Sequence, residues 1–282
     1  APEIVAGGTD FYPALGHGTA PAHIVDLSRI AALRGVSRTA EGWRIGAATR
    51  WSDLLRADLP PAFDGLRAAA REVGSVQIQN AGTVGGNLCN ASPAADGVPP
   101  LLTLGAEVEL ASLRGTRRLP LAAFLTGVRR TLRAPDEILT AVEIPAAAAE
   151  GRRGAFVKLG ARRYLVISIA MAAATVSCGA DGRILKAAVS VGACAPVACR
   201  LPVLEAALAG MARPALERPG AARAGWRGMR GAGCCPLRGA GGRGLPGFVA
   251  APRVTRRGGR SRCPSRGTRV PCLPCRPRCR RL

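Results

Sequence analysis

Two glycine-rich segments hold the residues whose types and spacing are best suited to binding chemistry. The first is Ile4-Val5-Ala6-Gly7-Gly8-Thr9-Asp10-Phe11, and the second is Thr83-Val84-Gly85-Gly86-Asn87. Backbone N–H groups approach an anion closely only where no Cβ intervenes, and successive amides in such a turn form a partly positive concavity. The pattern therefore predicts two backbone cradles that hold one extended, diphosphate-bearing ligand from both sides.

Neither segment matches a standard nucleotide-binding motif. The first lacks the third glycine of a dinucleotide-binding turn, and neither is followed by Gly-Lys-Ser or Gly-Lys-Thr. One formal G-x-G-x-x-G match covers residues 239–244, but it follows no strand pattern and precedes no helical one. We interpret that match as chance, and the sequence argues against an ordinary NAD or ATP fold.

Other catalytic residue sets are missing from the sequence pattern. It shows no carboxylate pair, no Ser-His-Asp set and no histidine cluster, and we interpret the two histidines, His17 and His23, as structural. Four cysteines lack metal-ligand spacing and are most simply buried thiols: Cys89, Cys178, Cys194 and Cys199. Hydrolytic and metal-based catalysis by this chain are therefore not indicated.

The composition changes sharply near residue 210. The chain has 282 residues, 48% hydrophobic content and a formal net charge of +22, which favours a two-domain globular protein. Residues 211–282, however, contain 18 Arg, no Lys and a single acid, Glu217. This tail is also rich in glycine, proline and cysteine, so it cannot build a core, whereas residues 1–210 resemble an ordinary soluble enzyme.

Three interpretations of the tail remain open. Arginine without acid is the pattern of a disordered nucleic-acid-binding arm, although aromatic residues for base stacking are nearly absent. Cys263, Cys272, Cys275 and Cys279 could form a metal-binding knuckle, although proline flanks these residues. We favour the third interpretation, in which the gene is read out of frame after about Gly210, because shifted GC-rich codons yield Arg, Gly, Ala, Pro and Cys.

Strand and helix patterns alternate along residues 1–210 and predict an α+β protein. Strands are expected at 4–6, 24–27, 43–47, 107–112, 116–119 and 138–144, and helices at 51–56, 61–72, 98–104 and 120–124. The dense polar residues of 75–96 predict a ligand floor. After an alanine-rich linker, a second unit is expected to contain strands at 155–159 and 183–191, a helix-like apolar run at 167–176 and a helix at 201–208.

Five motifs together resemble the FAD-binding subunit of the molybdenum hydroxylases, the family that includes xanthine dehydrogenase and the medium subunit of aerobic carbon monoxide dehydrogenase. They are VAGGTD at 5–10, TVGGNLCNASPAAD at 83–96, RGTRRLPL at 114–121, PDEIL at 135–139 and FVKLGARR at 156–163. The resemblance implies a two-subdomain FAD-binding domain at 1–145 and a smaller, incomplete α+β flavoprotein C-terminal domain at 152–210. The irregular tail, 211–282, has no counterpart in the family.

The resemblance also implies roles for individual residues. In the family, the segments that match Ile4 to Phe11 and Thr83 to Asn87 hold the pyrophosphate of FAD, Asp96 makes a polar contact on the adenosine half, and Leu139 and Lys158 contact the cofactor. The residues themselves leave alternatives open. Asp96 could instead cap the helix that begins near Val98, Leu139 could be ordinary core, and Lys158 could be a solvated strand residue.

The implied function is electron transfer. Electrons would arrive from an iron–sulfur subunit and leave to NAD or another acceptor, while a molybdopterin subunit would choose the substrate. A stand-alone flavin oxidoreductase and a basic nucleic-acid-associated protein remain as alternatives. We expect a cytoplasmic protein with no membrane or nucleic-acid partner, and an upstream strand and helix before Ala1, because the first strand starts so close to it.

Overall fold

The computed structural model describes residues 2–16, 18–19, 21–162 and 165–212. All of these residues belong to one compact unit. Residues 213–282, and with them the three interpretations of the tail, lie outside the described residues. No helix within the described ranges is long and apolar enough to cross a membrane.

Two antiparallel sheets organise the described residues. The five-stranded sheet has the order β3 (Val36–Arg38), β4 (Gly42–Gly46), β9 (Ile138–Pro145), β5 (Glu107–Ser112) and β6 (Gly115–Pro120). The four-stranded sheet has the order β10 (Arg153–Leu159), β11 (Ala170–Cys178), β12 (Ile184–Gly192) and β13 (Cys199–Arg200). Two small sheets pair β1 (Glu3–Val5) in parallel with β2 (Ile24–Asp26), and β7 (Leu125–Gly127) with β8 (Arg130–Thr131).

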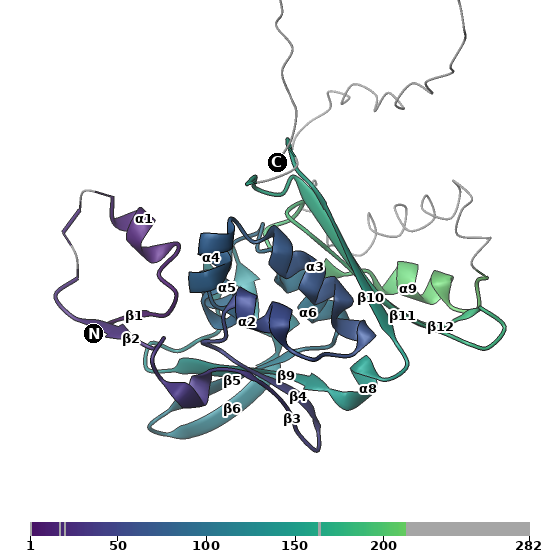
Figure 1. Ribbon diagram of the computed structural model, residues 1–282, viewed down its shortest axis with the longest axis horizontal. Helices are drawn as coiled ribbons and strands as arrows, with labels where there is room; N and C mark the ends of the chain where they lie inside the picture. Colours follow the sequence, from purple (N-terminus) through teal and green to yellow (C-terminus); the bar gives the residue numbers. More distant parts are fainter. Residues whose placement is uncertain (1, 17, 20, 163–164, 213–282) are drawn as a thin grey trace, which may run out of the picture. The chain divides into compact units, whose positions relative to one another are not determined.

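Helices fill the space between the two larger sheets (Figure 1). They are α2 (Trp51–Arg56), α3 (Asp64–Glu72), α4 (Val76–Ala81), α5 (Val84–Asn90) and α6 (Val98–Thr103). Shorter elements are α1 (Phe11–Leu15), α7 (Leu121–Phe124), α8 (Ala146–Ala149), α9 (Pro202–Leu208) and the 3₁₀ turns η1 (Ala31–Leu33) and η2 (Pro61–Phe63). The central core, which includes Trp51, Phe63 and Leu101, lies among these helices and the five-stranded sheet.

Close backbone contact joins α3 to β10. On α3, Leu66, Ala69 and Ala70 follow helical spacing and are fully buried. A Cβ on Gly154 of β10 would overlap the carbonyl oxygen of Ala62, and one on Gly65 would lie 2.9 Å from the carbonyl oxygen of Ala155. Glycine at both positions therefore lets the four-stranded sheet dock directly on the helical layer.

The expected helix-like run at 167–176 is wrong, because this segment forms the central strand β11. Met171, Ala173 and Thr175 are buried and alternate with less buried neighbours, which is the period of a strand. Alanine-rich composition favours a helix locally. Pairing with β10 on one side and β12 on the other overrides this preference.

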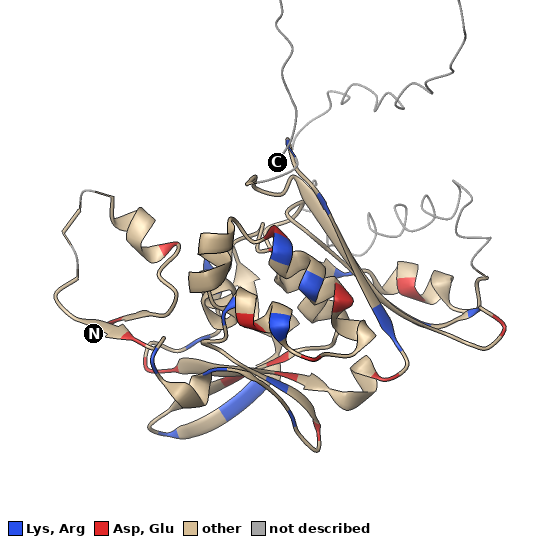
Figure 2. Ribbon diagram, viewed as in Figure 1, with Lys and Arg blue, Asp and Glu red and all other residues tan. Residues whose placement is uncertain are grey.

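An ion-pair network crosses the five-stranded sheet, where Figure 2 shows basic and acidic positions on neighbouring strands. Arg44 of β4 donates to Glu109 of β5 at 2.8 Å and also to Glu143 of β9. Arg118 of β6 donates to Glu109 at 3.3 Å. The hydrogen bond from Arg44, with smaller effects from Thr140 and Arg118, lowers the pKa of Glu109 from 4.5 to about 2.

A second charged contact ties β10 to the helical layer. Lys158 Nζ donates to Asp96 Oδ2 at 2.7 Å and to the Glu72 carbonyl oxygen at 3.2 Å, while Ser168 Oγ donates to Asp96 Oδ1 at 2.8 Å. The side chains of Lys158 and Asp96 are each only 9% exposed. Burial raises the pKa of Asp96, against the opposing effect of the hydrogen bond and charge of Lys158.

We expect the ionised Glu109 side chain to stabilise the fold above pH 4.5, and this stabilisation to disappear as the pH falls through about 2, because its pKa is lower in the folded state. Glu109→Gln should flatten the dependence of the unfolding free energy on pH across this interval, as measured by urea denaturation. Glu41→Gln is the control, since the Glu41 side chain is 78% exposed. Identical pH profiles for Glu109→Gln and the wild type would contradict the expectation.

Asp96→Asn should lower the free energy of unfolding by about 3–5 kcal/mol, because it leaves the Lys158 ammonium buried without a charged partner. The double variant Asp96→Asn/Lys158→Met should recover much of this loss in urea denaturation. Asp64→Asn, which removes an exposed pair with Arg67, should cost less than about 1 kcal/mol. A double variant no more stable than Asp96→Asn would show that the buried charge is not the cause.

Candidate functional site

The two glycine-rich segments meet at one cavity of about 850 Å³. All eight residues from Ile4 to Phe11 line it, together with Thr83, Gly86 and Asn87 of the second segment. Residues more than seventy positions apart are thus brought to a single site, as the sequence predicted. Val84 is the exception, because its side chain is fully buried in the core and lines neither this cavity nor the smaller slot beside it.

Glycine is required in the first segment for two different reasons. A Cβ on Gly7 would overlap the carbonyl oxygen of Ala81, so this position lets the segment pack against the α4–α5 connection. Gly8 has φ of +67°, a conformation that L side chains rarely adopt, and a Cβ there would lie 2.5 Å from the ring of Tyr12. The segment therefore turns sharply while it touches the opposite wall of the cavity.

The amides of the first segment are available to a ligand. No described residue accepts a hydrogen bond from the backbone N–H groups of Gly7, Gly8, Thr9 or Asp10. Unpaired amides are costly when buried, and four successive donors at the edge of a cavity suit an anion. This segment has the properties of the predicted backbone cradle.

The second segment is not the glycine loop that the sequence suggested. Residues from Val84 onward form α5, with Thr83 as its N-cap accepting from Gly86 N at 3.0 Å. Val84 N donates to Thr49 O, Gly85 N to Ala47 O and Asn87 N to Thr83 O. Because the amides from Val84 to Asn87 are already paired, these four residues can offer a ligand only side chains. Gly85 is explained by packing, since a Cβ would lie 2.7 Å from that of Ala47.

Asn87 carries an unsatisfied polar atom at the cavity wall. Its Oδ1 is buried and has no hydrogen-bond partner among the described residues. An unpaired buried acceptor costs about 1–3 kcal/mol. A ligand with a donor group would relieve this cost.

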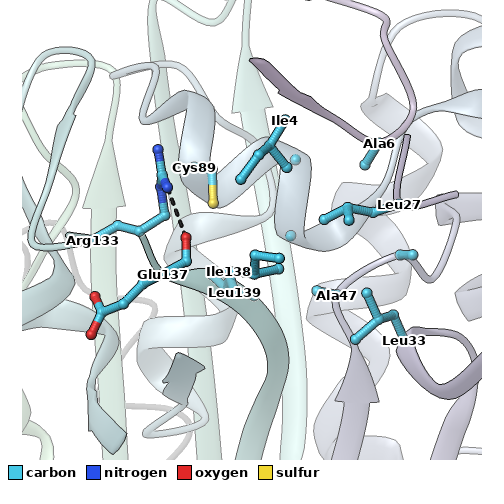
Figure 3. Close-up of a pocket in the computed structure, with 13 residues that line it drawn as sticks. Ile4, Ala6, Leu27, Leu33, Ala47, Cys89, Arg133, Glu137, Ile138 and Leu139 are labelled. Carbon is cyan, nitrogen blue, oxygen red and sulfur yellow. Dashed lines mark hydrogen bonds between the residues drawn. The ribbon is translucent and has the colours of Figure 1, made fainter. Parts of the chain in front are cut away.

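A smaller apolar slot of about 110 Å³ adjoins the same segments (Figure 3). Ile4, Leu27, Ile138 and Leu139 contribute to its walls, and Leu139 is 3% exposed. The two interpretations of Leu139 therefore coincide, since it belongs to the core and also lines the slot. The polar cavity and the apolar slot share Ile4, Ala6, Gly86, Cys89 and Arg133.

Sequence reasoning missed several residues at the cavity, and three of them come from one stretch of chain. Arg129, Thr131 and Arg133 all line the cavity from the β7–β8 hairpin and the loop after it. The alternate spacing of Thr131 and Arg133 is the signal that could have found these two, because alternate residues of an extended chain share one side. Arg129 adopts φ of +57° and donates to Asn90, which in turn donates to Asp10 Oδ2 at 3.0 Å.

Glu137 shapes the loop that carries Arg133. Its carboxylate accepts from Arg117 Nε at 2.6 Å and from Ala134 N at 2.8 Å, and these bonds lower its pKa from 4.5 to about 2. Arg133 Nη1 donates to the Glu137 carbonyl oxygen at 2.8 Å, as Figure 3 shows. The carboxylate of Glu137 is thus committed to the loop, and the guanidinium of Arg133 lies beside the Cys89 thiol.

Asp96 and Lys158 lie elsewhere, since they pair with each other and line neither the large cavity nor the slot. Lys158 instead borders a separate cavity of about 380 Å³ with Glu72 and Arg162. The alternative that Asp96 caps α6 is wrong, because the N-cap of α6 is Gly97 and the N-terminus of this helix has no side-chain cap. Lys158 is also not a solvated strand residue.

The remaining polar candidates have other positions. Of the polar residues in 75–96, Thr83, Asn87 and Asn90 line the cavity, whereas Gln79 is buried and donates to Arg71 O. His23 is exposed, and His17 lies outside the described residues. The expectation of buried thiols is wrong for Cys178 and Cys194, which are exposed, and Cys199 is half-buried. Cys89 is accessible from the cavity, yet burial among its neighbours raises the pKa of its thiol to about 11. No cluster that could hold a metal ion occurs among the described residues.

The sequence of this chain matches a known protein family and several of its members. Residues 1–147 match the model for the FAD binding domain in molybdopterin dehydrogenase. The xanthine dehydrogenase FAD-binding subunit of Escherichia coli O157:H7 is 34% identical over 208 residues, which are 70% of this chain and 69% of that protein. The nicotinate dehydrogenase FAD-subunit of Eubacterium barkeri is 36% identical over 173 residues, or 60% of this chain and 58% of the relative.

A solved structure agrees with this relationship. A chain of carbon monoxide dehydrogenase from Hydrogenophaga pseudoflava aligns with a TM-score of 0.72 and 27% identity, covering 82% of this chain and 78% of that one. The family match and this likeness confirm the predicted α+β fold class. The chain therefore belongs to the FAD-binding subunits of the molybdenum hydroxylases, and it is an oxidoreductase subunit whose cofactor is FAD.

Proposed function

We propose that this chain passes electrons from an iron–sulfur partner subunit to NAD or another acceptor, in a complex whose molybdopterin subunit acts on the substrate. Bound FAD supplies the redox chemistry, because its isoalloxazine ring takes up and releases electrons. Support comes from relatives named as FAD-binding or medium subunits and from a solved relative whose name mentions a molybdenum cofactor. The cytoplasmic location stays a prediction.

One observation carries the proposal: the four residues from Gly7 to Asp10, whose amides have no partner among the described residues, line the cavity that Thr83 and Asn87 also line. The amides would hold the diphosphate, since successive N–H groups bind anions without a formal positive charge. The hydroxyl of Thr83 and the unpaired Oδ1 of Asn87 add polar contacts. These donor and acceptor types fit FAD, which carries phosphate oxygens as well as hydroxyl and amino groups.

The other residues of the site have supporting roles in this proposal. The apolar slot with Ile4 and Leu139 would exclude water from part of the cofactor. Asp96 and Lys158 remain proposed FAD contacts, and their ion pair would have to accommodate the cofactor. We also propose the FAD-binding domain at 1–145 and the flavoprotein C-terminal domain at 152–210, with 211–282 as a separate tail.

The first test is the absorbance spectrum of the purified full chain after incubation with FAD and gel filtration. We expect retained flavin absorption bands, because the cavity offers donors that compete with water for the phosphates. Anaerobic addition of NADH should bleach these bands if NAD is the acceptor. Flavin bands that NADH leaves unchanged would indicate a different acceptor, whereas a colourless protein would contradict FAD binding by the isolated chain.

Gly7→Ala should release FAD without unfolding the protein. The added Cβ would overlap the Ala81 carbonyl oxygen, so the first segment must move away from the opposite wall. We expect FAD affinity to fall by at least about tenfold, in fluorescence titration, as the loss of one charge-assisted hydrogen bond would cause. Gly127→Ala is the matched control, because its Cβ would meet only Arg130 at 3.8 Å. Equal FAD affinity of both variants would contradict this role of Gly7.

A further inference from the structure

We propose that Arg133 is a binding residue for the diphosphate of FAD and supplies the positive charge that the amide cradle lacks. The inference rests on the proposed function and extends it to a residue in the loop after β8. Arg133 is half-buried and lines both the polar cavity and the apolar slot. It therefore stands where a ligand that occupied both spaces would pass.

The guanidinium of Arg133 has uncommitted donors. Its Nη1 donates to the carbonyl oxygens of Glu137 at 2.8 Å and Ala134 at 3.3 Å. No bond from Nε or Nη2 to any described residue is formed, and no carboxylate of the described residues pairs with it. A guanidinium held by backbone carbonyls on one edge keeps its full charge and offers its other edge, a geometry that suits phosphate oxygens.

The other cations near the cavity are less available. Lys158 is paired with Asp96 and lines a different cavity. Arg129 lines the cavity but donates to Asn90, which bridges it to Asp10. Two carboxylates, those of Glu3 and Asp10, also line the cavity and would repel an anion. Arg133 is thus the cation best placed to offset this repulsion.

The position of Arg133 is fixed by residues that do not reach the ligand. Glu137 binds Arg117 and the backbone of Ala134, which holds the loop in one conformation. The backbone of Arg133 is held as well, by a bond from its N–H to Thr131 Oγ1 at 3.4 Å. A preorganised cation costs less entropy on binding than a free surface arginine.

The test is FAD titration of the full chain, followed by fluorescence, for Arg133→Gln and for Arg130→Gln. Arg130 is exposed, neighbours the same hairpin turn and lines neither cavity, so it is a matched control for charge. We expect Arg133→Gln to raise the Kd for FAD by about tenfold or more. It should also reduce the dependence of that Kd on salt, because one screened attraction is lost. Arg130→Gln should change neither.

Two controls separate a loss of binding from a loss of folding. Circular dichroism checks that the Arg133→Gln protein is folded, and Arg133→Lys tests the role of the charge. The lysine variant should recover part of the affinity, since it keeps the charge without the planar fork. Failure of the wild type to bind FAD would count against the proposed function itself. If the wild type binds FAD and Arg133→Gln has the same Kd and salt dependence, only this inference is overturned. It is also overturned if Arg133→Gln weakens the affinity for NADH and leaves the affinity for FAD unchanged.

Discussion

The close approach of the first glycine-rich segment to the α4–α5 connection is the constraint on which the site depends. Gly7 sits against the Ala81 carbonyl with no room for a Cβ. This contact lets a segment with almost no buried side chains form one wall of the cavity. Its amides stay unpaired because the chain turns at Gly8 before they can join a strand or helix. Packing and ligand binding are therefore properties of the same few atoms.

Residue type and spacing predicted much of this architecture. Most strands and helices lie within a few residues of the expected ranges, because turns punctuate the apolar runs. β11 could not be predicted locally, since its alanines favour a helix and only pairing with two neighbours makes it a strand. The α5 helix was missed for the opposite reason. Gly85 and Gly86 suggested a loop, whereas Thr83 caps a helix whose glycines permit close packing.

The site itself was predicted only in part. Both glycine-rich segments reach one cavity, but they are not equivalent, because the amides from Gly7 to Asp10 are unpaired among the described residues and those from Val84 to Asn87 are paired. Arg133 carries no motif around it that marks a binding residue, and its role depends on a loop held by Glu137 and Arg117. Lys158 was the more visible cation in sequence. Its partner Asp96 lies 62 positions away, and only the fold reveals their contact.

The Asp96–Lys158 pair also connects the four-stranded sheet to the cavity wall. Gly97 follows Asp96 directly, and a Cβ at this position would overlap the ring of Trp51 and lie 3.3 Å from Asn87 Oδ1. Trp51 and Asn87 both line the cavity. A shift of β10 would therefore move Asp96 and press Gly97 against two residues of the site. Through this contact, the position of the second sheet bears on the shape of the FAD cavity, although none of its strands lines that cavity.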